Sequence, residues 1–184
     1  LKGSLSFHMN GTVFALILRY TYQNTADEQS GALLQFLENG IQCMNEHVVP
    51  DYVLAHYIAD GMETTAAELY ENMEYSCAKS HDLKQRYVRC TGDIREETAR
   101  RRYLRERIQT VDKMHGFEGW FQPIQCMSTE KFCSMEALIR LRDTDGTLIS
   151  PAEFIPLAEQ TGHISAITWF VVEEVCRVLK YSPR

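Results

Sequence analysis

The stretch Cys133-Ser134-Met135-Glu136-Ala137-Leu138-Ile139-Arg140-Leu141 decides the fold of the C-terminal part of this chain. Side chains of a strand alternate between two faces, so the odd-numbered residues form one wholly apolar face. We expect that face to pack under a layer of helices. The opposite face comprises Ser134, Glu136, Leu138 and Arg140. It therefore presents a carboxylate and a guanidinium two positions apart.

Glu136 and Arg140 allow two interpretations. From spacing alone we favour a simple ion pair at the rim of a sheet. In the functional interpretation, Glu136 holds a divalent metal and Arg140 holds a phosphate. Hard cations such as Mg2+ take oxygen ligands, and a planar guanidinium matches phosphate oxygens in pairs.

The residues around this stretch predict two strands followed by two helices. Residues 119–126 and 132–141 form the strands, and Asp145-Gly146 marks a turn. A helix begins at Ser150, with proline at its first position and glutamate where a capping box places it, and it ends near Gly162. The second helix covers about 165–180. We interpret Trp120 and Trp169 as core residues.

The N-terminal half predicts alternating strands and helices. Asn10-Gly11 favours a tight hairpin within residues 4–22. We expect a polar loop at 23–30 and a helix at 31–48 that is weakened by Gly40. A strand at 52–58, a helix opening at Thr64-Thr65 and a short strand at 86–90 follow. The alternation indicates an α/β or α+β domain.

Residues 93–114 predict a helix rich in charge. Glu96 and Arg100, like Glu97 and Arg101, are spaced for ion pairs along one helix, and Leu104, Ile108 and Val111 supply an apolar stripe. We interpret the arginines as a solvated linker face, because no interleaved aromatic residues accompany them.

The composition excludes several classes of protein. Of 184 residues, 45% are hydrophobic and 24% are charged, and the net charge is -6, which argues against nucleic acid as a partner. No run approaches the roughly 18 apolar residues of a membrane-spanning helix, so we expect no membrane contact from this segment. The six cysteines form no C-x-x-C, which predicts reduced thiols in a cytoplasmic protein and no zinc site.

Three blocks closely resemble the EAL phosphodiesterase family in order and spacing. They are Phe121-Gln122-Pro123-Ile124, Glu136-Ala137-Leu138-Ile139-Arg140, and the block from Ile149 to Glu159. The resemblance implies a (β/α)8 barrel that binds cyclic di-GMP with Mg2+ or Mn2+ and hydrolyses it to linear pGpG. It implies that Glu136 is a metal ligand. It also implies that Gln122, Leu138 and Arg140 contact the dinucleotide, Arg140 through phosphate.

A weaker resemblance, over Phe7 to Leu18, is to the hairpin of the GGDEF diguanylate cyclase family. That family needs two acidic residues in the turn, where this chain has Thr12 and Val13. The arginine and aspartate of the family's inhibitory site would fall at Leu1 and Ser4. The resemblance therefore implies a degenerate, regulatory domain that is not a diguanylate cyclase.

The expected fold class is α/β, in three parts. Residues 1–92 form a partial GGDEF-like domain, 93–115 a linker helix, and 116–184 the first strands and helices of an EAL-type barrel. A (β/α)8 barrel takes roughly 250 residues, so we expect the remaining metal ligands to follow Arg184 and this segment alone to be inactive. We expect a longer, homodimeric parent, with any membrane anchor upstream.

Two function classes stay open for that parent. In the first it is an enzyme that hydrolyses cyclic di-GMP, regulated by the degenerate domain. In the second it is a non-catalytic receptor for cyclic di-GMP, or a scaffold that binds another protein. The retained Glu136, Gln122 and Arg140 favour the enzyme.

Overall fold

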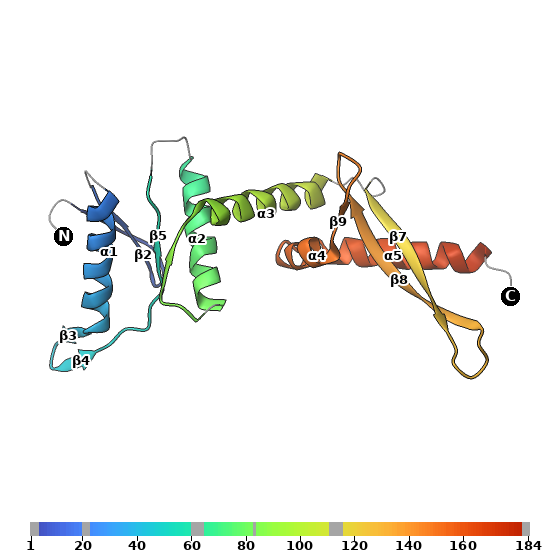
Figure 1. Cartoon of the computed structure of the whole chain (residues 1–184), viewed down its shortest axis with the longest axis horizontal. Helices are drawn as coiled ribbons and strands as arrows, with labels where there is room; N and C mark the ends of the chain where they lie inside the picture. The colour runs from blue at the N-terminus through green and yellow to red at the C-terminus, as the bar shows by residue number, and fades with distance from the viewer. Residues whose placement is uncertain (1–3, 20–22, 60–64, 83, 111–115, 182–184) are drawn as a thin grey trace. The chain divides into compact units, whose positions relative to one another are not determined.

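The computed structural model describes residues 4–19, 23–59, 65–82, 84–110 and 116–181. The chain forms two compact units, Leu1–Thr98 and Ala99–Arg184. Figure 1 follows the chain from its N-terminus to its C-terminus. Leu1, Thr64, Val111 and the end of the predicted linker helix lie outside the described residues.

The first unit begins with the predicted hairpin. Strands β1 (Leu5–Asn10) and β2 (Val13–Ile17) pair antiparallel, with Asn10 opposite Val13. The turn is therefore centred on Gly11 and Thr12, one residue later than the sequence predicts. Gly11 has φ of 46°, a left-handed conformation that glycine adopts at no steric cost.

Helix α1 (Gln23–Glu38) begins where we expected a polar loop, so that prediction was wrong. Its first half turns small residues inward, and Ala26 and Ser30 are buried. The Ser30 hydroxyl donates to the Ala26 carbonyl at 3.0 Å and lies 3.1 Å from Nδ1 of His56, so the buried oxygen has two polar partners. A buried face built from such small residues leaves little apolar periodicity in the sequence.

The predicted helix over 31–48 ends after Glu38, so its second half was wrong. Gly40 has φ of 75° and terminates the helix. A β-carbon there would lie 2.7 Å from Nε2 of His47. Two short antiparallel strands follow, β3 (Ile41–Cys43) and β4 (Glu46–Val48).

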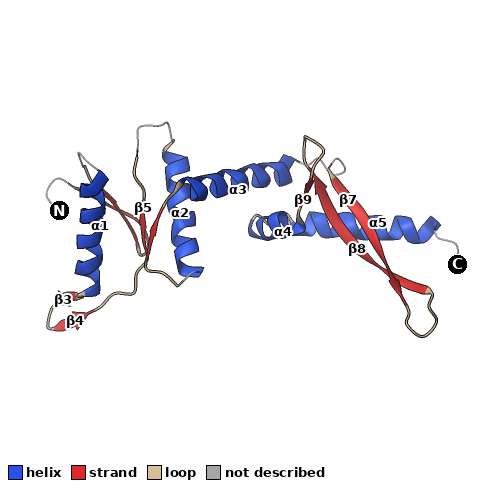
Figure 2. Cartoon of the chain, viewed as in Figure 1, coloured by secondary structure: helices blue, strands red, loops and turns tan. Residues whose placement is uncertain are grey.

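The rest of the first unit is a strand–helix–strand unit, seen in Figure 2 beside the label α2. Strands β5 (Leu54–His56) and β6 (Tyr87–Arg89) are parallel, and α2 (Ala66–Asp82) connects them. Thr65 caps α2 as predicted, because its hydroxyl accepts from the Glu68 N–H and the Glu68 carboxylate accepts from the Thr65 N–H.

Helix α3 (Gly92–Thr110) begins in the first unit and continues into the second. Among the described residues, Arg100 contacts Asp143 and Glu153 rather than Glu96, the partner that helical spacing predicts. Leu104 and Ile108 are buried as predicted, at 2% and 4% exposure.

The second unit packs one sheet against helices. Strand β7 (Phe117–Gln125) pairs antiparallel with β8 (Phe132–Arg142), which also pairs with β9 (Leu148–Ile149). Helices α4 (Pro151–Gln160) and α5 (Ile164–Tyr181) follow, and α5 runs beside the β7–β8 ribbon (Figure 1). Both predicted strands and both predicted helices are confirmed. The antiparallel β7–β8 pair differs from the parallel pairs of a (β/α)8 barrel, and the barrel stays a prediction.

The core of the second unit combines residues of α3, β8, β9, α4 and α5. Its buried residues are Leu104, Ile108, Leu141, Ile149, Phe154, Leu157, Ala158 and Ile167. Ser150 caps α4 as predicted, accepting from the Ala152 N–H at 3.3 Å. The Glu153 side chain instead forms the ion pair with Arg100.

Gly119 marks the closest approach of β7 to α5. A β-carbon at this position would lie 3.2 Å from both Cβ and Cγ of Glu174. We expect Gly119→Val to lower the free energy of unfolding by about 1–3 kcal/mol, because the added methyl groups must displace α5. Urea denaturation measures this. Gly31→Ala in α1 is the control, because nothing lies within 4 Å of its β-carbon and alanine favours helix. Unchanged stability in Gly119→Val would contradict this close packing.

Candidate functional site

The β7–β8 register brings the predicted site residues together. Gln122 in β7 lies directly across from Glu136 in β8, and Trp120 lies across from Leu138. Arg140 follows on the same face of β8, because strand side chains alternate. Residues directly opposite in an antiparallel pair have β-carbons about 4.5–5.5 Å apart. One face of a single strand pair therefore carries all four predicted residues, Gln122, Glu136, Leu138 and Arg140.

This face is open to solvent. Gln122 and Glu136 are exposed, whereas Leu138 and Arg140 are half-buried. The opposite face of β8 packs on the helices as predicted: Leu141 is fully buried and Ile139 packs against the core. An exposed row of one amide, one carboxylate and one guanidinium on a rigid strand pair can contact a polar ligand without rearranging the core.

The ion pair expected between Glu136 and Arg140 is absent from the described residues. The Arg140 guanidinium instead lies over the indole ring of Trp120, with its central carbon 5.7 Å from the ring centroid. Its Nη1 donates to the Ile139 carbonyl at 2.8 Å. The simple structural interpretation of the two charges is therefore wrong, and Glu136 keeps its carboxylate free of any cationic partner in the described part of the chain.

Sequence reasoning missed Glu118 and Trp120 on this face. Trp120 is 45% exposed and Trp169 is 68% exposed, so the prediction that both are core residues was wrong. The indole Nε1 of Trp120 donates to the Glu118 carboxylate at 3.0 Å. Alternation along β7 places Glu118 and Trp120 on the same face as Gln122, so the reasoning used for β8 would have found them if applied to β7.

Arg142 binds Glu118 through two parallel hydrogen bonds. Its Nε donates to Oε1 at 2.5 Å and its Nη2 to Oε2 at 2.9 Å. This arginine, and then Trp120, lowers the pKa of Glu118 to about 2. The carboxylate is therefore ionised throughout the physiological range.

Replacing Arg142 with glutamine is expected to raise the pKa of Glu118 toward its ordinary value of about 4.3, because the guanidinium stabilises only the ionised form. A lowered pKa stabilises the fold above the unfolded-state value, and that stabilisation is lost as the pH falls through 2. Titration of the Glu118 side-chain carbon by NMR measures the shift. The exposed Glu173 carboxylate is the control, and an unshifted Glu118 in the variant would contradict the assigned cause.

The described residues do not by themselves suit a divalent metal. They contain no group of three histidine, cysteine, aspartate or glutamate side chains that could hold an ion. Mg2+ prefers six oxygen ligands, and the predicted ligand Glu136 has only the amide of Gln122 directly across from it. A metal at Glu136 would need further ligands from outside this set.

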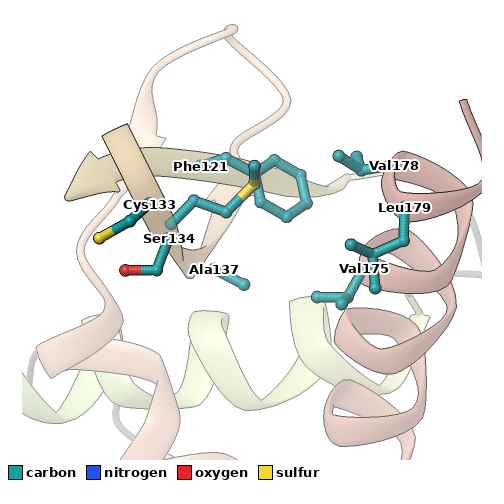
Figure 3. Close-up of a pocket in the computed structure, with 8 residues that line it drawn as sticks. Phe121, Cys133, Ser134, Ala137, Val175, Val178 and Leu179 are labelled. Atoms are coloured by element: carbon teal, nitrogen blue, oxygen red, sulfur yellow. The ribbon is translucent and has the colours of Figure 1, made fainter. Parts of the chain in front are cut away.

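A separate apolar pocket lies on the helix-facing side of the sheet, between β8 and α5 (Figure 3). Its volume is about 290 Å3. It is lined by Phe121, Cys133, Ser134, Met135, Ala137, Val175, Val178 and Leu179. Ser134 also lines this pocket, although alternation predicts the other face, and the strand pairing becomes irregular just beyond it, between Ile124 and Gln125. The pocket offers a nucleotide almost no hydrogen-bonding partners.

In the part of the chain that the structure describes, no helix is both long and apolar enough to cross a membrane.

Comparison with known protein families bears on this site. Residues 103–182 match the family model of the EAL domain, a segment that contains all four predicted residues. The match begins within α3 and extends to the end of α5.

Two curated relatives have names that refer to signalling or to cyclic di-GMP. The chain is 27% identical over 176 residues to the signaling protein YkoW of Bacillus subtilis (strain 168), covering 92% of this chain and 22% of that protein. It is 32% identical over 74 residues to the cyclic di-GMP phosphodiesterase PdeL of Escherichia coli (strain K12), covering 40% and 20%. The chain thus spans about a fifth of the length of either relative.

A solved structure, the S helix-GGDEF-EAL part of Vibrio cholerae LapD bound to c-di-GMP, has a TM-score of 0.42 and 13% identity, covering 98% of this chain and 42% of that one. A likeness at this score supports no conclusion about this chain. The EAL match and the phosphodiesterase relative support a relationship to EAL-type proteins of cyclic di-GMP signalling. The matched segment begins at residue 103 and does not include the hairpin of the first unit.

Proposed function

We propose that residues 116–184 supply the first part of a cyclic di-GMP site, in a longer signalling protein that hydrolyses the dinucleotide. One observation carries the proposal: the antiparallel register sets Gln122 opposite Glu136, with Arg140 and Leu138 on the same exposed face. Residues from two of the three EAL-like sequence blocks thus become neighbours in space.

Each residue has a chemical role in this proposal. Arg140 binds a phosphate, since its planar guanidinium can donate two hydrogen bonds to phosphate oxygens. Gln122 offers an amide that can both donate to and accept from a base edge. Leu138 supplies apolar contact. Glu136 would be the first ligand of Mg2+ or Mn2+, and further carboxylates from the parent would complete the metal site.

The overall reaction adds one water across one phosphodiester bond of cyclic di-GMP. The P–O bond to one ribose breaks, and linear pGpG leaves with a 5′-phosphate and a free 3′-hydroxyl. The residues described here bind and orient the dinucleotide in this scheme.

We propose a regulatory role for residues 1–92, joined to the EAL-like part by the helix at 93–115. The hairpin turn, centred on Gly11 and Thr12, carries no carboxylate at the positions where a cyclase would hold its metal. We expect the parent to lack diguanylate cyclase activity, and we propose separately that it is a cytoplasmic homodimer. Incubation with GTP and Mg2+ should yield no cyclic di-GMP.

The deciding experiment uses the full-length protein that carries this sequence, with cyclic di-GMP and Mg2+. Conversion to pGpG, measured by chromatography, supports the hypothesis that the parent is an enzyme. Binding without conversion, measured by calorimetry, supports the receptor instead. Neither binding nor conversion would overturn the cyclic di-GMP assignment and leave a protein-binding scaffold.

A further inference from the structure

Arg140 has a glutamate directly across the strand pair. The backbone of Glu118 in β7 is the register partner of Arg140 in β8. Opposite charges at such cross-strand positions attract each other. An ion pair between Glu118 and Arg140 would neutralise the guanidinium and occupy its N–H groups, so the arginine could not bind a phosphate without first losing that partner.

The structure gives Glu118 another partner. Arg142 binds both carboxylate oxygens, at 2.5 and 2.9 Å, and its remaining nitrogen Nη1 donates to the Gly146 carbonyl at 2.7 Å. Gly146 belongs to the tight turn that follows β8, so all three nitrogens of the Arg142 guanidinium have hydrogen-bond partners. The Trp120 indole donates a third hydrogen bond to Glu118, at 3.0 Å. Both oxygens of the carboxylate are therefore occupied.

Arg140 is held in a different way. Its guanidinium lies over the Trp120 ring, 5.7 Å from the centroid, and one N–H reaches the Ile139 carbonyl. An aromatic face stabilises a cation through its ring electrons and consumes none of the N–H donors. No carboxylate among the described residues contacts Arg140.

We propose that Arg142 and Trp120 are positioning residues that keep Arg140 open for a phosphate. Arg142 holds Glu118 away from Arg140. Trp120 supports the Arg140 guanidinium from one face, and its N–H donates to Oε2 of Glu118, an oxygen that also accepts from Arg142. This proposal rests on the proposed function of the face, namely that Arg140 binds a phosphate of cyclic di-GMP. Neither positioning residue touches the dinucleotide.

The test measures the dissociation constant of cyclic di-GMP for the full-length protein by calorimetry. Arg142→Gln releases Glu118, which then pairs with Arg140, and affinity should fall about two- to fivefold, the range of an exposed ion pair. The double variant Glu118→Gln with Arg142→Gln removes the competitor, so its affinity should return to that of the unchanged protein. A merely structural role of Arg142 would give a double variant at least as weak as the single one.

A second pair of variants tests Trp120 separately. Trp120→Phe keeps an aromatic face and should retain more affinity than Trp120→Leu, which loses it. Circular dichroism on every variant reports whether it is folded. If Arg142→Gln does not fold, the affinities of Trp120→Phe and Trp120→Leu test the positioning role instead. Equal affinities for these two variants would overturn the role of Trp120.

Arg140→Ala separates failure of this inference from failure of the proposed function. It should weaken binding about 10- to 100-fold, because it removes charge-assisted hydrogen bonds to phosphate. Unchanged affinity in Arg140→Ala would overturn the proposed function itself. A loss in Arg140→Ala, combined with no loss in Arg142→Gln or no recovery in the double variant, would overturn only the positioning role.

Discussion

Glu136→Gln in the full-length protein is expected to reduce conversion of cyclic di-GMP to pGpG by about 100-fold or more. The amide has nearly the shape of the carboxylate but lacks its negative charge, so it is a poor ligand for Mg2+. Loss of even an outer-shell partner of a metal ligand costs about 10–100-fold, and loss of the ligand itself should cost at least as much. The initial rate of pGpG formation at saturating Mg2+ measures the effect.

The matched control for this variant is Glu173→Gln. Glu173 is an exposed residue of α5 in the same unit, and the same chemical change there should leave the rate unchanged. Glu136 is exposed and lacks a cationic partner among the described residues, so its replacement should not lower the melting temperature. A Glu136→Gln protein that hydrolyses the dinucleotide at the normal rate would rule out Glu136 as a metal ligand.

Phe154→Ala is expected to lower the free energy of unfolding by about 3–5 kcal/mol. Phe154 lies on α4 with 0% of its surface exposed, and its ring packs 5.9 Å from the ring of Phe117. Removing a fully buried phenyl group loses its transfer free energy and leaves a cavity that the helices fill only in part. Urea denaturation followed by circular dichroism measures the change.

Phe132→Ala provides the comparison for that prediction. Phe132 begins β8 in the same unit but is 71% exposed, so the same truncation should change stability by about 0.5 kcal/mol or less. Similar losses in the two variants would mean that the core does not centre on Phe154.

The sequence was sufficient for the elements of the second unit because their signals are strong and local. The alternation from Cys133 to Leu141 predicts both faces of β8, and Ser150-Pro151 predicts the start of α4. The pairing of Gln122 with Glu136 was harder to predict, because it depends on the register across the β7–β8 loop. That register is irregular near Ile124, which no period-two pattern reveals.

The wrong predictions for α1 and Trp120 also have physical causes. The start of α1 was taken for a loop because the helix buries Ala26 and Ser30, which give no apolar periodicity. Trp120 was taken for core because tryptophan is usually well buried. Its place beneath Arg140 depends on the pairing of β7 with β8, which composition alone does not show.

The antiparallel pairing of β7 with β8 has a consequence for how the candidate site assembles. Gln122 and Glu136 are joined by one short loop, so the face forms by local zippering, and hairpins form within about 1–10 μs. Correct assembly then depends on a single alignment of two strands. A slip by one residue would turn Glu136, Leu138 and Arg140 together toward α5 and bring Met135 and Ile139 to the outside. Burial of the apolar face of β8 thus selects the alignment that exposes the polar one.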